Sequence, residues 1–294
     1  MLQEQIKLSN GETIAYLKEG SGSHILVLIH GNMNSSINWD IFLEHVSETF
    51  TVYAPDLRGF GDSSYEQAIT SIKDFSDDLK LFTDALKLKS FTLVGWSLGG
   101  NVSMQYAIDY PEDVKKLVLM ASGSIKGFPI RKRVFFGFIK TKHYIEHLAD
   151  MEKAIKPLEK LKEHNNVSFI RRLLNNSLYS KTKPDEARYA AYIEAMIKQR
   201  NLAETNLALT YFNISDTHNG VVEGNNLVSS ITCPVLMIHG KEDRVVPYDV
   251  AVDNHDALKN ISVLEPLDAS HAPLLDSRKK VMALIESFAK SSRD

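Results

Sequence analysis

The sequence has a single cysteine, Cys233, and little that points to a membrane or to nucleic acid. One cysteine excludes an internal disulfide framework and permits a reducing compartment. No apolar run approaches the roughly 20 residues of a membrane-spanning helix, and the first residues lack the apolar core of a signal peptide. A formal net charge of −3 gives no general attraction to nucleic acid or anionic lipid. We therefore expect a soluble, cytoplasmic protein that binds neither.

The composition is otherwise that of an ordinary globular enzyme. Hydrophobic residues make up 44 % and charged residues 24 % of the 294 residues. This length suits one large domain, or a core domain that carries an insertion. The sequence shows neither a cluster of metal-ligating side chains nor a glycine-rich loop that would cradle phosphates, so we expect no metal and no cofactor. The oligomeric state is left open.

Short apolar runs alternate with longer amphipathic stretches over the first 123 residues and again near the C-terminus. Several runs are rich in β-branched residues and apolar on both faces, as buried parallel strands are. The predicted strands are residues 25–29, 51–54, 91–94, 116–120, 234–238 and 261–264. Helices are predicted over residues 74–86, 101–110, 248–258 and 279–288. This alternation favours a mostly parallel sheet covered by helices on both faces.

The middle of the chain has a different pattern. Residues 124–229 show no strong strand and are rich in Lys, Glu, Asn and Leu at helical spacing, with one helix expected after Pro184. We interpret residues 124–229 as a helical cap, or lid, over the C-terminal edge of the sheet. Residues 1–123 and 230–294 would then form the core. The alternative is a helical linker without a function of its own.

A Gly-x-Ser-x-Gly pattern, from Gly95 to Gly99, follows the predicted strand 91–94 and precedes a predicted helix. This is the strand–turn–helix setting of a nucleophile elbow. The serine must lie in a tight, strained turn for its hydroxyl to project above the sheet, and glycine on either side leaves room for the crowded strand and helix. Ser97 is therefore the candidate nucleophile. The alternative is a glycine-rich turn with an inert serine.

A serine nucleophile needs a base, usually a histidine that a carboxylate holds in one tautomer. After this elbow the expected chain order is serine, then acid, then histidine. His271 is the preferred base because it lies in a loop of small residues after a strand, whereas His255 lies inside a predicted helix. Asp243 is the preferred acid because it follows the strand 234–238 and has a short side chain. Glu242 also qualifies by type.

Acyl transfer also needs hydrogen-bond donors for the negative charge that develops on the carbonyl oxygen. One donor should be the backbone N–H of Leu98, directly after the nucleophile. The second should come from the loop after the early strand, where Gly31 lets the chain turn so that the N–H of Asn32 faces inward. The side-chain amide of Asn32 is an alternative donor. We expect His30 to brace this loop and to have no chemical role.

Five segments together resemble the successive signatures of the α/β-hydrolase family, in the family's order. They are His30-Gly31, Asp56 to Ser63, the elbow at Ser97, Gly240 to Asp243, and Ser270-His271. The resemblance implies an α/β-hydrolase fold with an eight-stranded sheet and a helical lid. It also implies that Asp56 to Ser63 is scaffold. More narrowly, residues 30–40, 58–65 and 71–82 are similar to the bacterial intracellular poly(3-hydroxybutyrate) depolymerase-like branch.

These features predict a carboxylic ester hydrolase that forms an acyl-enzyme on Ser97. Its substrates would be small-molecule esters with short- to medium-chain acyl groups, 3-hydroxyacyl esters included. Ser97 argues against haloalkane dehalogenases and epoxide hydrolases, whose nucleophile is an aspartate, and the early loop is too poor in glycine for a carbon–carbon bond hydrolase. Two alternatives stay open: a cofactor-free haloperoxidase or perhydrolase, and a small-molecule receptor of the same fold with little turnover.

The predicted lid should close an apolar pocket above Ser97. Met33, Trp96 and Val245 are expected in its walls, together with the aromatic residue Phe128 from the lid. Trp96 is also a candidate for core packing, because its neighbour Val94 belongs to a buried strand. A closed pocket of this kind admits small ligands and excludes long polymers unless the lid moves.

Overall fold

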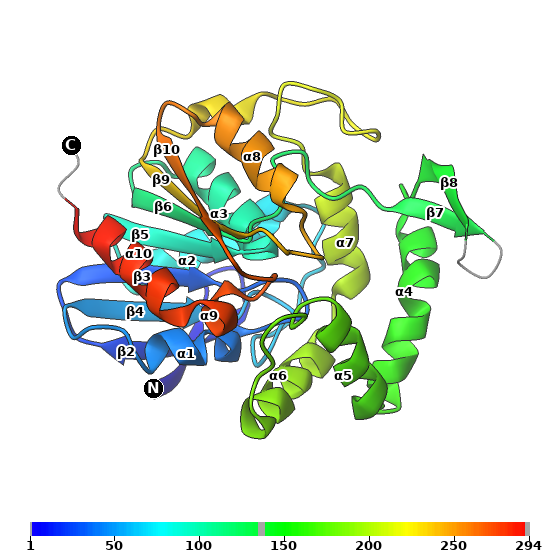
Figure 1. The fold of residues 1–294 in the computed structure, drawn as a ribbon, viewed down its shortest axis with the longest axis horizontal. Helices are drawn as coiled ribbons and strands as arrows, with labels where there is room; N and C mark the ends of the chain where they lie inside the picture. The colour runs from blue at the N-terminus through cyan, green and yellow to red at the C-terminus, as the bar shows by residue number, and fades with distance from the viewer. Residues whose placement is uncertain (1, 135–138, 292–294) are drawn as a thin grey trace.

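One central sheet runs through the protein, and six of its strands are the apolar runs of the sequence (Figure 1). The computed structural model describes residues 2–134 and 139–291. The strands of the central sheet are β1 (Leu2–Lys7), β2 (Thr13–Gly20), β3 (His24–Ile29), β4 (Phe50–Pro55), β5 (Phe91–Trp96), β6 (Val114–Met120), β9 (Val235–Gly240) and β10 (Ser262–Leu267). All six predicted strands are present. The first two, β1 and β2, did not emerge from the alternation of apolar runs.

The sheet has eight strands in the order β1-β2-β4-β3-β5-β6-β9-β10. The pairs β1–β2 and β2–β4 are antiparallel, and the other pairs are parallel. Strands β3, β5, β6 and β9 therefore end along one edge of the sheet, where the loops that follow them meet. The α/β-hydrolase fold with a mostly parallel sheet, expected from the sequence, is confirmed.

Helices cover both faces of this sheet (Figure 1). The helices of the core are α1 (Asp40–Leu43), α2 (Ile72–Ala85), α3 (Leu98–Asp109), α8 (Tyr248–Ala257), α9 (Pro273–Asp276) and α10 (Arg278–Lys290). Helices α2 and α3 pack on one face, and α1 and α10 pack on the other. Over residues 2–134 and 139–291, no helix is long and apolar enough to cross a membrane.

Alternate residues of the central strands supply two hydrophobic clusters, one on each face. In β3, Val27 and Ile29 belong to the cluster under α2 and α3, whereas Leu26 and Leu28 belong to the cluster under α1 and α10. This period of two is the side-chain alternation of a strand. It explains why these strands read as continuous apolar runs in the sequence.

The chain between β6 and β9, residues 121–234, leaves the sheet and is called the insertion below. Its elements are β7 (Arg131–Val134), β8 (Ile139–Tyr144), α4 (Leu148–Glu163), α5 (Val167–Asn176), α6 (Glu186–Lys198) and α7 (Leu202–Tyr211). The antiparallel pair β7–β8 lies in this region, where the sequence shows no strong strand. Both strands are rich in basic residues and lack a continuous apolar run, so their sequence does not show the pattern of a buried strand. Strands β7 and β8 lie with α4 on the outer side of the insertion (Figure 1).

Candidate active site

The turn between β5 and α3 holds Ser97 in a strained conformation. Its φ angle is 57°, which a residue with a side chain rarely adopts. A Cβ atom on Gly95 would lie 2.3 Å from the carbonyl oxygen of Gly99, and one on Gly99 would lie 2.2 Å from the carbonyl oxygen of Ile29. Both glycines of the pattern are therefore required by close backbone contacts, as the sequence predicts.

The structure brings Ser97, His271 and Asp243 together, although they lie far apart in the sequence. His271 Nε2 is 3.0 Å from Ser97 Oγ, and His271 Nδ1 is 2.7 Å from Asp243 Oδ2. Ser97 follows β5, Asp243 follows β9, and His271 follows β10. All three loops leave the same edge of the sheet. The arrangement is a continuous hydrogen-bonded row from carboxylate to imidazole to hydroxyl.

Asp243 is a buried carboxylate with several donors around it. Its Oδ1 accepts hydrogen bonds from the N–H groups of Val245 (2.8 Å) and Val246 (2.9 Å). Its Oδ2 lies 3.3 Å from Nε2 of His239, in addition to its bond with His271. Burial opposes the negative charge, but the bonds from His239, His271 and the Val246 N–H outweigh it and hold the pKa of Asp243 well below its ordinary range.

The two rival residues from the sequence lie outside this row. Glu242 is exposed and pairs with Lys181 on the insertion. His255 lies on α8, where its Nδ1 is 2.7 Å from Oγ of Ser262. His30 is buried: its Nε2 accepts a bond from the N–H of Leu57, and its Nδ1 lies 2.8 Å from the carbonyl oxygen of its neighbour. His30 thus links two loops, as expected of a bracing residue.

The backbone N–H groups of Asn32 and Leu98 are both available as donors beside Ser97. Leu98 is the first residue of α3, so its N–H has no partner within the helix. The N–H of Asn32 has no hydrogen bond to any other part of the chain that the structure describes. The side-chain amide of Asn32 is occupied: it donates to Asn206 on α7 and accepts from Gln199. The alternative role for that side chain, as a donor to the oxyanion, does not fit these bonds.

A cavity of about 530 Å³ opens above Ser97. Its lining includes Met33 and Val245 from the core and Phe128 from the insertion. The lining residues are Asn32, Met33, Asn34, Ser97, Leu98, Asn101, Gly123, Phe128, Ile130, Leu173, Leu174, Asn176, Ser177, Leu178, Asn206, Leu209, Val245, Val246 and His271. Apolar side chains and neutral amides therefore surround the hydroxyl.

The prediction that Trp96 lines this pocket is wrong. The indole is 3 % exposed and packs in the cluster on the other face of the sheet, 6.2 Å from the ring of Trp39. Its Nε1 donates to the carbonyl oxygen of His271 over 2.9 Å. Trp96 and Val94 are two residues apart on one strand, so they share a face. Through this hydrogen bond Trp96 holds the loop that carries His271.

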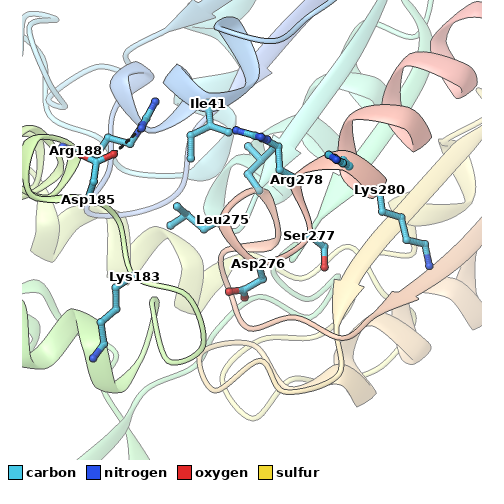
Figure 2. Close-up of a pocket in the computed structure, with 11 residues that line it drawn as sticks. Ile41, Lys183, Asp185, Arg188, Leu275, Asp276, Ser277, Arg278 and Lys280 are labelled. Carbon is cyan, nitrogen blue, oxygen red and sulfur yellow. Dashed lines mark hydrogen bonds and ion pairs between the residues drawn. The ribbon is translucent and has the colours of Figure 1, made fainter.

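A second hollow, of about 580 Å³, lies where the start of α6 meets α1, α9 and α10. Neither Ser97 nor His271 lines it, and most of its lining is charged. Figure 2 shows Asp185 and Arg188 joined on one side of the hollow, with Arg278 and Lys280 on the other side. This hollow is a seam between the insertion and the core, and no residue of the Asp243–His271–Ser97 row lines it.

Several buried polar contacts at the site were missed from the sequence. His239 had no assigned role, although it stands four residues before Asp243 at the end of a strand. Gln199, between α6 and α7, accepts a hydrogen bond from the N–H of Met33 over 3.0 Å and donates to Asn32 over 2.9 Å. No local pattern marks Gln199, because its partners lie more than a hundred residues away in the sequence.

The chain matches several known proteins. The sequence model of the α/β hydrolase fold matches residues 24–277. An uncharacterized protein of Mycobacterium tuberculosis is 36 % identical over 121 residues, which are 41 % of this chain and 35 % of that protein. The chain thus matches only about a third of the length of that relative. A pimeloyl-acyl-carrier-protein methyl ester esterase of Aliivibrio fischeri is 27 % identical over 275 residues, which cover 92 % of this chain and 95 % of that protein.

One relative comes from the class that the early loop argued against. A 2-hydroxy-6-oxononadienedioate hydrolase of Paraburkholderia phymatum is 26 % identical over 244 residues, covering 81 % of this chain and 77 % of that protein. Carbon–carbon bond hydrolases are therefore among the similar proteins. The number of glycines in the early loop is not sufficient to separate the two classes.

Two solved structures share the whole fold. An esterase from Exiguobacterium antarcticum superposes with a TM-score of 0.73 at 21 % identity, over 99 % of this chain and 100 % of that one. A bromoperoxidase from Bacillus anthracis gives the same TM-score and identity over the same shares. At such identities the likeness concerns the fold alone.

Proposed function

Since the chain belongs to the α/β-hydrolase family, we propose that it is a serine hydrolase that cleaves neutral carboxylic esters. The observation that carries the proposal is the hydrogen-bonded row Asp243–His271–Ser97, in which Ser97 and His271 line a cavity large enough for a small substrate. The esterase relative from Aliivibrio fischeri, which matches nearly the whole chain, supports the same class of reaction.

Each residue of the row has a defined part in the proposed reaction. His271 Nε2 takes the proton of Ser97 while Oγ attacks the acyl carbon, and the C–O bond to the alcohol breaks as His271 returns that proton to the leaving oxygen. The acyl group is then bound to Ser97. Water, deprotonated by His271, attacks the same carbon and releases the acid. Asp243 accepts the hydrogen bond from Nδ1 and stabilises the imidazolium that forms in each half of the reaction.

The N–H groups of Asn32 and Leu98 are the proposed donors for the oxyanion. Backbone donors next to the nucleophile stabilise charge on the carbonyl oxygen without having to reorganise. A single donor of this kind is worth on the order of 10²–10³ in kcat. The fixed position of the Asn32 loop, which Gln199 and Asn206 hold, suits this role.

The cavity favours a substrate without charge. Its lining within residues 2–134 and 139–291 contains neither lysine nor arginine. A carboxylate buried there would lose its water without gaining a cation, which costs several kcal/mol. The name of the relative from Paraburkholderia phymatum contains a dioate, which is a dicarboxylate. A dicarboxylate does not suit such a cavity. This contrast favours ester hydrolysis over that carbon–carbon bond cleavage.

We further propose short- to medium-chain acyl groups, 3-hydroxyacyl groups included. The volume of about 530 Å³ is in the range of small-ligand sites. Leu173, Leu178 and Leu209 offer apolar wall, and the amide of Asn206 offers a partner for a hydroxyl group. An unsubstituted acyl chain contacts only these leucines, whereas a hydroxyacyl chain contacts the leucines and also forms a hydrogen bond with Asn206.

The test is turnover of a panel of p-nitrophenyl esters from acetate to palmitate, with Ser97→Ala as the matched variant. We expect a burst of nitrophenol, sustained turnover afterwards, and covalent labelling of Ser97 by a fluorophosphonate. Ser97→Ala should lose both turnover and label and keep its thermal midpoint. A burst without later turnover would favour a receptor. Halogenation of a phenol, dependent on peroxide and acetate and faster than ester cleavage, would favour a perhydrolase.

A further inference from the structure

Asn34 lines the cavity above Ser97, and within residues 2–134 and 139–291 its side-chain amide has no hydrogen-bond partner. The residue is only 4 % exposed, yet neither atom of its side-chain amide makes a hydrogen bond to any other described residue. A buried polar group usually has a partner, because its loss of water is otherwise uncompensated. An unpaired amide at a cavity wall is therefore a site where a ligand atom can supply the missing bond.

The position of Gly31 places this amide close to the nucleophile. A Cβ atom built on Gly31 would lie 3.0 Å from Nδ2 of Asn34 and 3.1 Å from Cβ of Ser97. The amide nitrogen and the serine side chain thus lie on either side of the same small space. A bulkier residue at position 31 would separate them.

Asn34 is not needed to hold its own loop together. The carboxylate of Asp56 accepts a bond from the N–H of Ser36 over 2.6 Å, and the amide of Asn38 accepts one from the N–H of Ser35 over 3.0 Å. The side-chain amide of Asn32, two residues earlier, is hydrogen-bonded to Asn206 and Gln199 of the insertion. Asn38 also has an unpaired amide nitrogen, but Asn38 does not line the cavity above Ser97, whereas Asn34 does.

We propose that the side-chain amide of Asn34 donates a hydrogen bond to the substrate's carbonyl oxygen as that oxygen becomes negative. Asn34 would then be a third oxyanion donor, beside the backbone N–H groups of Asn32 and Leu98. This inference rests on the proposed function, since it needs an acyl carbon under attack by Ser97. A donor aimed at the developing charge acts in the transition state and leaves substrate binding nearly unchanged.

The experiment compares Asn34→Ala and Asn34→Asp with the wild-type protein on p-nitrophenyl butyrate. Both variants should lower kcat by about 10²–10³ with KM within about threefold of wild type. Affinity for a trifluoromethyl ketone, which forms an oxyanion on the serine, should fall by the same factor. Asn34→Asp keeps the size of the side chain and removes the donor, so it remains informative if the alanine variant does not fold.

Two controls separate a donor from a structural role. Ser35→Ala removes the cap of the short helical turn that follows in the same loop, and Asn260→Ala removes an exposed asparagine in a turn before β10. We expect both variants to keep kcat near the wild-type value. If Ser35→Ala lowers kcat as much as Asn34→Ala does, loosening of the loop explains the loss and the inference is wrong.

The remaining outcomes are equally decisive. Unchanged kcat in the Asn34 variants, or a rise in KM alone, would overturn the inference while leaving ester hydrolysis intact. Wild-type protein without ester turnover, or Ser97→Ala with full turnover, would instead overturn the proposed function. A loss of kcat matched by a loss of ketone affinity, in a folded variant, supports the third donor.

Discussion

The edge of the sheet and the insertion both contribute to one cavity, but they are held in place by different forces. At the sheet edge, Ser97 and its neighbouring glycines are fixed by backbone contacts so close that a Cβ atom would overlap them. The insertion supplies side-chain walls, such as Phe128 and Leu173, and reaches the core through polar bonds. The proposed chemistry therefore lies on the rigid part, and the proposed substrate choice lies on the part that can vary.

The insertion itself is attached unevenly. Its α6–α7 half bonds to the core through groups that are buried or partly buried: Gln199 holds the Asn32 loop, and Arg188 donates to Asp40 over 2.8 Å. Its outer half, with β7, β8 and α4, packs on α7 through a small cluster around Ile145 and Met151. Loss of the Gln199 contact in the α6–α7 half should thus affect kcat, whereas changes in the outer half should affect access and size selection.

Substitution of Asp243, at the edge of the sheet, should have the largest single effect on kcat. Asp243→Asn should lower kcat by about 10⁴, because an amide favours the wrong tautomer of His271. Glu242→Gln is the matched control, since Glu242 is exposed and pairs only with the insertion in the described contacts. Steady-state ester hydrolysis measures both. Damage from Glu242→Gln with an active Asp243→Asn would move the acid to residue 242.

The inner half of the insertion should show the next largest effect. Gln199→Ala removes two bonds to the loop that carries the Asn32 N–H, so we expect kcat/KM to fall by about 10²-fold through misplacement of that donor. Gln105→Ala on α3 is the control, because Gln105 bonds only to Asp109 on its own helix among the described side chains. Equal activity of the two variants would show that the loop holds its position alone.

The walls should affect chain-length preference. Each methylene gains about 0.8 kcal/mol of burial, or roughly fourfold in kcat/KM, until the cavity is full. The profile over acyl length should therefore rise and then fall. Phe128→Ala should move the maximum to longer chains without changing the value for acetate esters, because Phe128 comes from the insertion. A profile that climbs steadily to palmitate would instead indicate an open groove.

Acid should weaken the contribution of the Asp243 carboxylate to stability. Its pKa is lowered in the folded state, so the ionised group stabilises the fold above the unfolded pKa of about 3.9. That contribution is lost as the pH falls below about 4. The difference in thermal midpoint between wild type and Asp243→Asn should thus narrow from pH 7 to pH 3. A difference that stays constant over this range would show that the charge adds no stability.

Loss of an exposed ion pair between the insertion and the core should have the smallest effect on stability and activity. Lys198 on α6 pairs with Asp62 over 2.9 Å, but both side chains are about two-fifths exposed. Such pairs are worth about 0–1 kcal/mol. Lys198→Met should therefore shift the thermal midpoint by no more than about 2–4 °C and leave kcat unchanged. A larger fall in the thermal midpoint would show that Lys198 helps to hold the insertion against the core.

Sequence patterns predicted what depends on neighbours along the chain. The central strands, the elbow and the loops that carry Asp243 and His271 follow from apolar periodicity and turn chemistry within short windows. The positions that failed depend on distant partners. The amide of Asn32 is occupied by Gln199 and Asn206 from the insertion, and no local pattern announces that pairing.

Two other positions have local causes. For Trp96 the sequence supports two expectations, a pocket wall and core packing beside Val94, and the structure places the indole in the core. Strands β7 and β8 are rich in basic residues and lack a continuous apolar run, so they do not show the pattern of buried strands. Apolar alternation therefore predicts the buried strands of the central sheet but not a short, basic two-stranded ribbon.

The place of the insertion within the sheet also has a consequence for how the protein folds. Strands β1 to β6 follow one another in the sequence and form one continuous part of the sheet. Strand β9 pairs with β6, but residues 121–234 separate the two strands in the sequence. Closing a loop twice as long costs only about 0.6 kcal/mol more, so the insertion lowers the final stability little. Contacts of high sequence separation nevertheless slow folding. We therefore expect refolding experiments to find β1–β6 protected first, with β9, β10 and the completed Asp243–His271 pair arriving in a later, slower phase.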